Sequence, residues 1–327
     1  MKNFIAKVIL FILIIIFVQV MISRFIAPQI ISIPLGIPGI RKLDKYLYDH
    51  YKVIYFGDSV IRATSPNDVD QSSIVQMFSK ISPGLTVGDL SSPAYHLGIF
   101  EAMADYISRS QSKPEAIIVP INLRSFSPEW DMRPEYQFEN EIFFLTSSHF
   151  LTYFSKPLSV LHLVKTNTVS IDTYLSTPVY YGKTIVGIVK KYQDEGLLTK
   201  PEPENIKDFY ILDYMYSLNE SHRKLISLSK LIDIAQKSGI KVYPYVIPID
   251  WEGGIKYVGS DFTKQVGTNI KVICSEIKKR NAPCLDISFG LSSDNFIHGD
   301  YPNEHLSQKG REFVAKQVHD FFFKNEK

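Results

Sequence analysis

The sequence predicts an α/β protein built on a five-stranded parallel sheet with helices on both faces, in three layers. Short apolar runs rich in β-branched and aromatic residues alternate with longer segments whose apolar residues recur at helical spacing. Such alternation needs crossover connections, which make the strands parallel and lay the helices against the sheet. The 327 residues suffice for one large or two small domains, and a formal net charge of +2 is close to balanced.

The first element is an apolar N-terminal segment, which we expect to be a membrane anchor over residues 1–24. Residues 8–22 are apolar apart from Gln19, and about 20 such residues cross a bilayer as one helix. A cleaved signal peptide is the alternative, but no small-x-small cleavage site follows the apolar run. Lys2 and Lys7 favour a cytoplasmic N-terminus. The remaining chain would then lie outside the cytoplasmic membrane, in the periplasm or the extracellular space.

Residues 25–45 are predicted to be a linker, because Pro28, Pro34 and Pro38 prevent a continuous helix. One α/β domain should follow over residues 46–327. Its five expected strands are the apolar runs at 53–56, 85–90, 116–121, 241–249 and 284–287. The expected helices between and after them cover 96–110, 219–239, 261–280 and the segment from 307 onward.

Residues 125–218 interrupt the alternation and form an aromatic-rich insertion. We expect this insertion to lie over the carboxyl edge of the sheet as a cap. Most of its aromatic side chains should fill a small core of their own. The others would offer a stacking surface for sugar rings or rest on the membrane interface.

The composition also limits the function. No basic block is interleaved with aromatic residues, so nucleic acid is not an expected partner. The two cysteines, Cys274 and Cys284, lack metal-ligand spacing to any histidine, so a structural zinc site is not expected. No other metal and no cofactor is expected either. We expect two buried free thiols, on a helix and at the next strand, while a disulfide between them stays the alternative.

The tripeptide Gly57-Asp58-Ser59 directly follows the first strand, and His305 precedes the last predicted helix. A parallel strand delivers a serine placed in this way to the carboxyl edge of the sheet. A histidine could then act as the base that a serine nucleophile needs. The simpler interpretation is a turn at Ser59 and an ordinary residue before a helix at His305.

Two further strand ends should meet the same edge, the segments 88–94 and 120–125. The second contains Asn122, whose amide could hold an oxyanion together with backbone N–H groups. Asn122 could instead form only an Asx turn at the end of its strand. A serine, an imidazole and oxyanion donors together are the groups that acyl transfer requires. We therefore expect Ser59 and His305 to lie about 2.6–3.2 Å apart.

These motifs resemble the SGNH hydrolase superfamily, also called GDSL-type hydrolases, which has a flavodoxin-like three-layer fold. The resemblance covers most of the chain from about residue 50, apart from the insertion. It implies that Ser59 is the nucleophile, His305 the base and Asn122 an oxyanion donor.

The chain departs from the family pattern at three positions. Ala94 stands where the second motif usually has its glycine, so Gly88 is the expected substitute. The third motif has Pro120 and not the usual glycine before Asn122. Pro302 stands where the family has its acid, three residues before the histidine. Asp300 and Glu304 lie nearby, and we expect Asp300 to orient His305. A serine–histidine dyad oriented by a main-chain carbonyl is the alternative.

The resemblance implies a membrane-anchored serine esterase or O-acyltransferase. Its substrates would be acyl esters, above all acetyl esters, of a cell-surface glycan, or a small acyl ester. A membrane-bound acyltransferase would be its protein partner. The alternative is a non-catalytic subunit that binds a glycan or serves polysaccharide assembly. The sequence leaves the acceptor, the direction of transfer and the oligomeric state open.

Overall fold

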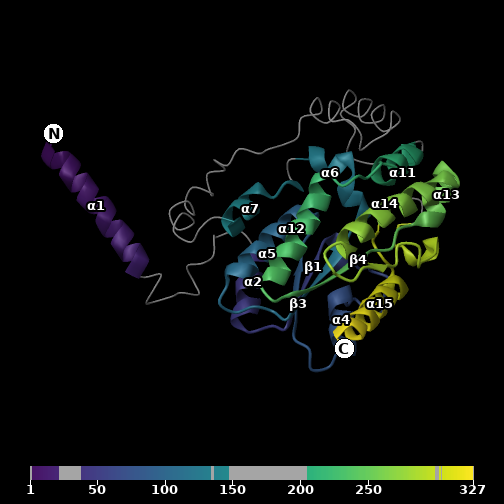
Figure 1. The fold of residues 1–327 in the computed structure, drawn as a ribbon, viewed down its shortest axis with the longest axis horizontal. Helices are drawn as coiled ribbons and strands as arrows, with labels where there is room; N and C mark the ends of the chain where they lie inside the picture. Colours follow the sequence, from purple (N-terminus) through teal and green to yellow (C-terminus); the bar gives the residue numbers. More distant parts are fainter. Residues whose placement is uncertain are drawn as a thin grey trace.

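The computed structural model describes residues 2–21, 38–133, 136–146, 205–298, 302 and 304–326. Most of the predicted linker and of the 125–218 insertion lies outside these residues, and so does Asp300. Within them the chain forms a sheet with helices on both faces (Figure 1). The predicted α/β class with a five-stranded parallel sheet is confirmed.

The sheet has the strand order β2-β1-β3-β4-β5, and every neighbouring pair is parallel. The strands are β1 (Val53–Gly57), β2 (Val87–Ser91), β3 (Ala116–Ile121), β4 (Lys241–Val246) and β5 (Leu285–Asp286). The chain builds the sheet outward from β1, first to β2 on one side and then to β3 on the other. The carboxyl ends of β1 and β3 therefore meet at a topological switch point, where ligands bind in sheets of this kind.

The strands are buried on both faces, as their nearly continuous apolar sequence predicts. Every residue of β1 and β3 is buried. Alternate residues point to opposite layers, so that Ile54 and Phe56 join one apolar core while Val53 and Tyr55 join the other. In the smaller of the two cores, the buried hydroxyl groups of Tyr55 and of Tyr245 in β4 are hydrogen-bonded to each other at 2.7 Å.

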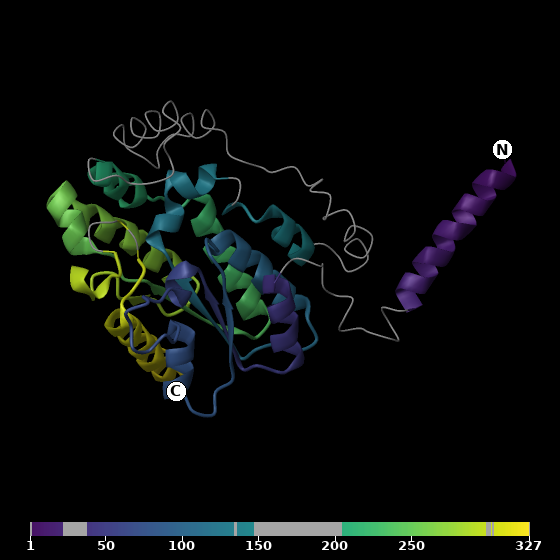
Figure 2. The same cartoon turned by 180° about the vertical axis from the view of Figure 1, so that it is seen from behind.

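Figures 1 and 2 show the two helical layers from opposite sides. The larger core is covered by helices from five parts of the chain: α2 (Pro38–Tyr48), α5 (Leu97–Arg109), α11 (Ile206–Tyr214), α12 (Arg223–Lys237) and α14 (Asp261–Lys278). The smaller core is covered by α4 (Ile74–Ile81) and α15 (Gln308–Glu326). The predicted helices thus form with ends shifted by a few residues.

Short elements occupy the segments that follow the strands. They are α3 (Ser59–Arg62), the 3₁₀ helix η2 (Leu123–Phe126), α6 (Pro128–Met132), α7 (Glu139–Thr146), α13 (Trp251–Val258) and the 3₁₀ helix η5 (Ser293–Asn295). The second half of η2, together with α6, α7 and α11, belongs to the predicted insertion. Trp130, Phe144, Tyr210 and Tyr214 in these elements are buried. In the described part of the insertion these aromatic residues therefore pack inside the protein.

The N-terminal segment forms α1 (Lys2–Met21), whose large apolar side chains from Phe4 to Val18 are mostly exposed. Within the described part of the chain, no helix has the length and apolarity needed to cross a membrane.

The cysteines form a disulfide between Cys274 of α14 and Cys284 just before β5. The expectation of two free thiols is therefore wrong. After α14 ends, Asn281 takes a left-handed backbone conformation, with φ 54°, and turns the chain back. This turn brings the two Cα atoms to 5.6 Å, within the usual range for a disulfide.

Candidate active site

Ser59 is the first residue of α3, directly after the carboxyl end of β1. Asp58 caps this helix, and its Oδ1 accepts a hydrogen bond from the backbone N–H of Val60 at 2.9 Å. A Cβ atom on Gly57 would lie 2.7 Å from the Ile61 side chain and 2.8 Å from that of Ser91. Glycine is thus required where the strand turns into the helix, and the turn holds Ser59 at the sheet edge.

His305 lies beside Ser59, with its Nε2 atom 3.0 Å from the serine Oγ. The main chain around His305 is fixed by a β-bridge between Phe296 and Leu306 and by a 2.8 Å hydrogen bond from Ile297 N–H to His305 O. The separation is within the expected range for a nucleophile and its base. The structure therefore brings the two residues together as expected, while their catalytic roles stay predictions.

The imidazole of His305 is neutral at physiological pH. Burial, the positive charge of Arg124 and the neighbouring His298 lower its pKa to about 4. The ring centroids of His298 and His305 are 6.2 Å apart. A neutral imidazole with Nε2 toward a hydroxyl can accept that proton, which is the state a general base requires.

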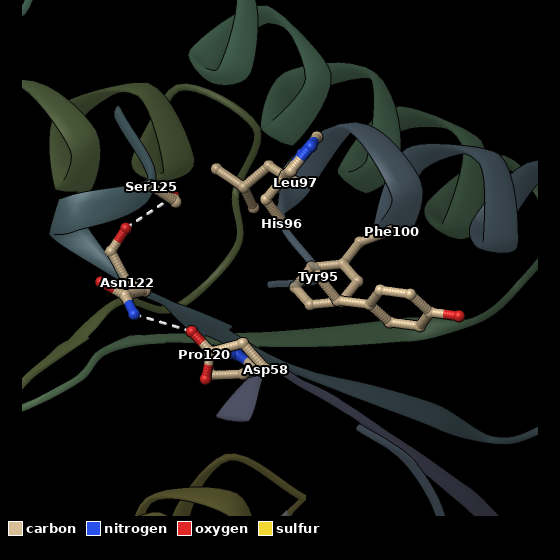
Figure 3. Close-up of a pocket in the computed structure, with 8 residues that line it drawn as sticks. All are labelled: Asp58, Tyr95, His96, Leu97, Phe100, Pro120, Asn122 and Ser125. Carbon is tan, nitrogen blue, oxygen red and sulfur yellow. Dashed lines mark hydrogen bonds between the residues drawn. The ribbon is translucent and has the colours of Figure 1, made fainter. Parts of the chain in front are cut away.

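Asn122 follows β3 and faces Asp58 (Figure 3). Its amide Nδ2 donates to Asp58 Oδ2 at 2.7 Å, and its Oδ1 accepts from Arg124 N–H at 2.9 Å. The second bond caps η2, so the Asx-turn interpretation describes the local structure correctly. Because one amide hydrogen is directed to Asp58, the oxyanion role of Asn122 stays a prediction that rests on the other hydrogen.

Asp58 is a buried carboxyl group whose pKa is raised to about 6, mainly by burial. The hydrogen bond from Asn122 counteracts this rise, and the carboxylate of Glu304 adds to it. The Asp58–Asn122 contact joins the ends of β1 and β3, so it fixes the position of the Ser59 turn relative to η2.

The structure does not bring Gly88 to the site. Gly88 pairs with Ile54 in the sheet, three positions before the Gly57–Ser91 pair at the carboxyl end, which is about 10 Å along a strand. A Cβ atom there would lie 2.6 Å from the Tyr46 ring, so close packing of α2 explains this glycine. Ala94, where the family has its glycine, has φ 61°, a left-handed conformation that glycine adopts more easily.

A cavity of about 10 Å³ is lined in part by Asp58 and Asn122 (Figure 3). Its lining includes His96, Tyr95 and Ser125 besides these two residues. The volume corresponds to about one water molecule. This cavity is therefore too small to hold a substrate.

Sequence reasoning assigns no role to Arg124 or Tyr214, and it marks Glu304 only as a carboxylate close to His305. Arg124 Nη1 donates to the carbonyl oxygen of Pro302 at 3.1 Å, and its Nε is 3.6 Å from Glu304 Oε2. The Tyr214 hydroxyl donates to the other oxygen of Glu304. The available signal was that Arg124 and Glu304 each lie within two residues of a predicted site residue.

The fold and site define a class: an α/β protein with a serine–histidine pair at the switch point of a parallel sheet. Fold and pair resemble SGNH-type hydrolases. No family model and no curated protein matches the sequence.

Solved structures of low similarity include an acetyl-xylooligosaccharide esterase from Geobacillus stearothermophilus, at 12% identity and TM-score 0.39, covering 83% of this chain and 93% of that one. An inhibitor-bound aryl esterase from M. smegmatis is similar at 9% identity and TM-score 0.39, covering 83% of this chain and 99% of that one. Since these values are low, the site geometry alone carries the functional conclusion.

Proposed function

We propose that the protein is a serine ester hydrolase or O-acyltransferase of SGNH type. The observation that carries this proposal is the 3.0 Å contact between Ser59 Oγ and His305 Nε2 at the carboxyl edge of the sheet. The two residues are 246 positions apart in the sequence, so only the tertiary fold brings them together.

In the proposed reaction, His305 Nε2 accepts the hydroxyl proton as Ser59 Oγ bonds to the acyl carbon. The tetrahedral intermediate then collapses, the ester C–O bond breaks, and the imidazolium returns the proton to the leaving alcohol. Water, or the hydroxyl group of an acceptor, attacks the acyl-serine in the second half and regenerates Ser59. Water gives hydrolysis and an acceptor hydroxyl gives transfer. The second amide hydrogen of Asn122 is the proposed oxyanion donor.

The proposed substrate class is an acetyl or other short acyl ester of a cell-surface glycan, handled outside the cytoplasmic membrane. The exposed apolar side chains of α1 support attachment to a membrane through this helix. The Cys274–Cys284 disulfide supports an oxidising compartment, where such bonds persist. A membrane-bound acyltransferase is the proposed partner if the reaction is transfer. The family resemblance supports the glycan and the partner.

A non-catalytic glycan-binding or assembly subunit is the second candidate. Two observations favour it: the Asn122 amide is engaged by Asp58, and the family's acid position is Pro302. Covalent labelling of the serine separates the two candidates, because a binding protein has no activated serine.

The test is covalent labelling with a fluorophosphonate probe, together with hydrolysis of p-nitrophenyl acetate. We expect the wild type to react at Ser59 and Ser59→Ala to lose about 10³-fold or more in turnover. Ser260→Ala, which changes an exposed serine at the start of α14, is the matched control and should behave as the wild type. A wild type that neither labels nor hydrolyses the ester would contradict the proposal.

A further inference from the structure

Arg124 links the end of β3 to the chain that leads into His305. Its backbone N–H bonds to Asn122 Oδ1, and its side chain reaches the 302–304 segment. There Nη1 donates to Pro302 O at 3.1 Å and Nε lies 3.6 Å from Glu304 Oε2. The Arg124 side chain is 17% exposed and that of Glu304 is fully buried. This charge pair is therefore shielded from water and lies beside the candidate base.

The Glu304 carboxylate lies between the Tyr214 hydroxyl and the Arg124 guanidinium. The Tyr214 hydroxyl, from α11, bonds to Oε1. Oε2 has no hydrogen-bond partner among the described residues, and the Arg124 guanidinium is its nearby charge. Removing one partner of a buried ion pair leaves the other charge uncompensated. Loss of Arg124 should therefore displace the segment that carries His305.

Pro302 stands three residues before His305, at the position where the family has its acid. Pro302 has no carboxylate, but its carbonyl oxygen is held by Arg124. An arginine offers several N–H donors in a fixed plane, so it can hold this carbonyl and the Glu304 carboxylate at once. A lysine, with a single nitrogen, cannot reproduce this geometry.

We propose that Arg124 is a positioning residue that holds His305 against Ser59 through the Pro302 carbonyl and the Glu304 carboxylate. This inference rests on the proposed function, because it concerns the same serine–histidine pair. Arg124 acts through the histidine-bearing segment.

The charge of Arg124 also affects the pKa of His305, and an uncharged side chain that only packed against this segment would not have this effect. Next to burial, Arg124 is the strongest influence that lowers the pKa of His305, followed by His298. Among the described residues, the other charged groups close to the serine–histidine pair are Glu304, adjacent to His305 in the chain, and Asp58, adjacent to Ser59. Replacing Arg124 by an uncharged residue should therefore raise the pKa of His305, whereas lysine should keep it low.

The experiment compares Arg124→Met and Arg124→Lys with Arg41→Met, which removes an exposed arginine of α2. The pKa of His305 is read from an NMR titration of its imidazole, assigned with His305→Gln, and needs no activity. The rate of fluorophosphonate labelling is measured across pH on the same full-length proteins.

Arg124→Met should raise the His305 titration midpoint from about 4 towards 6.5 and slow labelling by about 10²-fold, the cost of roughly 1 Å of misplacement. Arg124→Lys should leave the midpoint low. It should still slow labelling by roughly tenfold or more, because the histidine is again misplaced. Arg41→Met should change neither. Wild-type labelling by Arg124→Lys, or an unchanged midpoint in Arg124→Met, would overturn the inference.

An arginine variant that fails to fold would lose the circular-dichroism signal of the folded protein. In that case Glu304→Gln tests the same contact, because it keeps the shape of the side chain. It should slow labelling, and wild-type labelling in this variant would also overturn the inference. An unreactive wild type contradicts the proposed function, whereas a reactive wild type with an equally reactive Arg124→Lys contradicts only the positioning role.

Discussion

Two arginines hold the His305 segment from opposite sides. Arg124 binds upstream of the histidine, at Pro302 and Glu304. Arg311, in the first turn of α15, binds downstream, where Nη1 donates to Leu306 O at 3.0 Å. Arg311 also donates to Asp68 Oδ2 at 2.7 Å, and to the carbonyl oxygens of Asp70 and Ser72 at 2.6 and 3.0 Å.

The two arginines differ in what they affect: one acts on the stability of the fold and the other on the pKa of His305. Arg311 is fully buried and its three nitrogens bond to four acceptors, three of them in the 68–72 segment before α4. Its role is therefore to fasten α15 to the smaller core. Arg124 is partly exposed, its ion pair is longer, and its charge lowers the pKa of His305. One arginine thus holds the fold in place, and the other adjusts the candidate base.

The largest effect should come from Arg311→Met. The substitution removes the cation paired with Asp68 and the side-chain donor of three carbonyl groups, those of Asp70, Ser72 and Leu306. Breaking a buried ion pair typically costs about 3–5 kcal/mol. Urea unfolding should show this loss, whereas Arg124→Met should lose less because its pair is looser. Arg41→Met serves as the exposed control. Equal losses for Arg311→Met and Arg124→Met would remove the distinction between the two arginines.

A smaller effect should follow from changing the Asp58–Asn122 contact on the other side of Ser59. Asp58→Asn places two amide groups against each other, and Asn122→Asp places two carboxyl groups together. Each single change should cost about 1–3 kcal/mol, since a buried polar group loses its partner. The double change Asp58→Asn/Asn122→Asp restores a donor and an acceptor and should recover most of the loss. A double variant as unstable as the sum of the singles contradicts this geometry.

The smallest effect should appear in the pH dependence of stability. His305 titrates at about 4 in the folded protein and near 6.5 when unfolded, so the unfolded state binds more protons between these values. The free energy of unfolding should therefore fall as pH falls from 6.5 to 4. His96, with a pKa lowered to about 3, and His222, lowered to about 4, act in the same direction, chiefly through burial.

Asp58 acts oppositely in part of this window, because its raised pKa makes the folded state bind more protons between about 4 and 6. Urea unfolding at several pH values should show that His305→Gln reduces the acid dependence, as should Arg124→Met. Arg311→Met should keep the dependence between pH 6.5 and 4, and so should Arg41→Met, the exposed control. An identical slope in His305→Gln would contradict a lowered pKa for His305.

The sheet could be predicted because β1 and β3 are apolar on both faces, and because their β-branched and aromatic residues favour a strand over a helix. Ser59, Asn122 and His305 could be predicted to lie at one sheet edge because each follows or precedes a helix or strand there, while their catalytic roles stay predictions. Gly88 was misplaced because a glycine needed for packing against Tyr46 resembles one needed at a site. The disulfide and the Arg124–Glu304 pair depend on how two loops fold back, which local sequence patterns do not encode.

The separation of 246 positions between Ser59 and His305 sets the order in which the site is assembled. During synthesis, β1 and the Ser59 turn are made long before the segment that supplies the base. In the folded protein the segment that carries His305 is fastened on its downstream side by the bonds of Arg311 to the 68–72 segment. A nascent chain thus cannot form this pair before residue 305 has been made, and any reactivity of Ser59 that depends on the pair can begin only after that point.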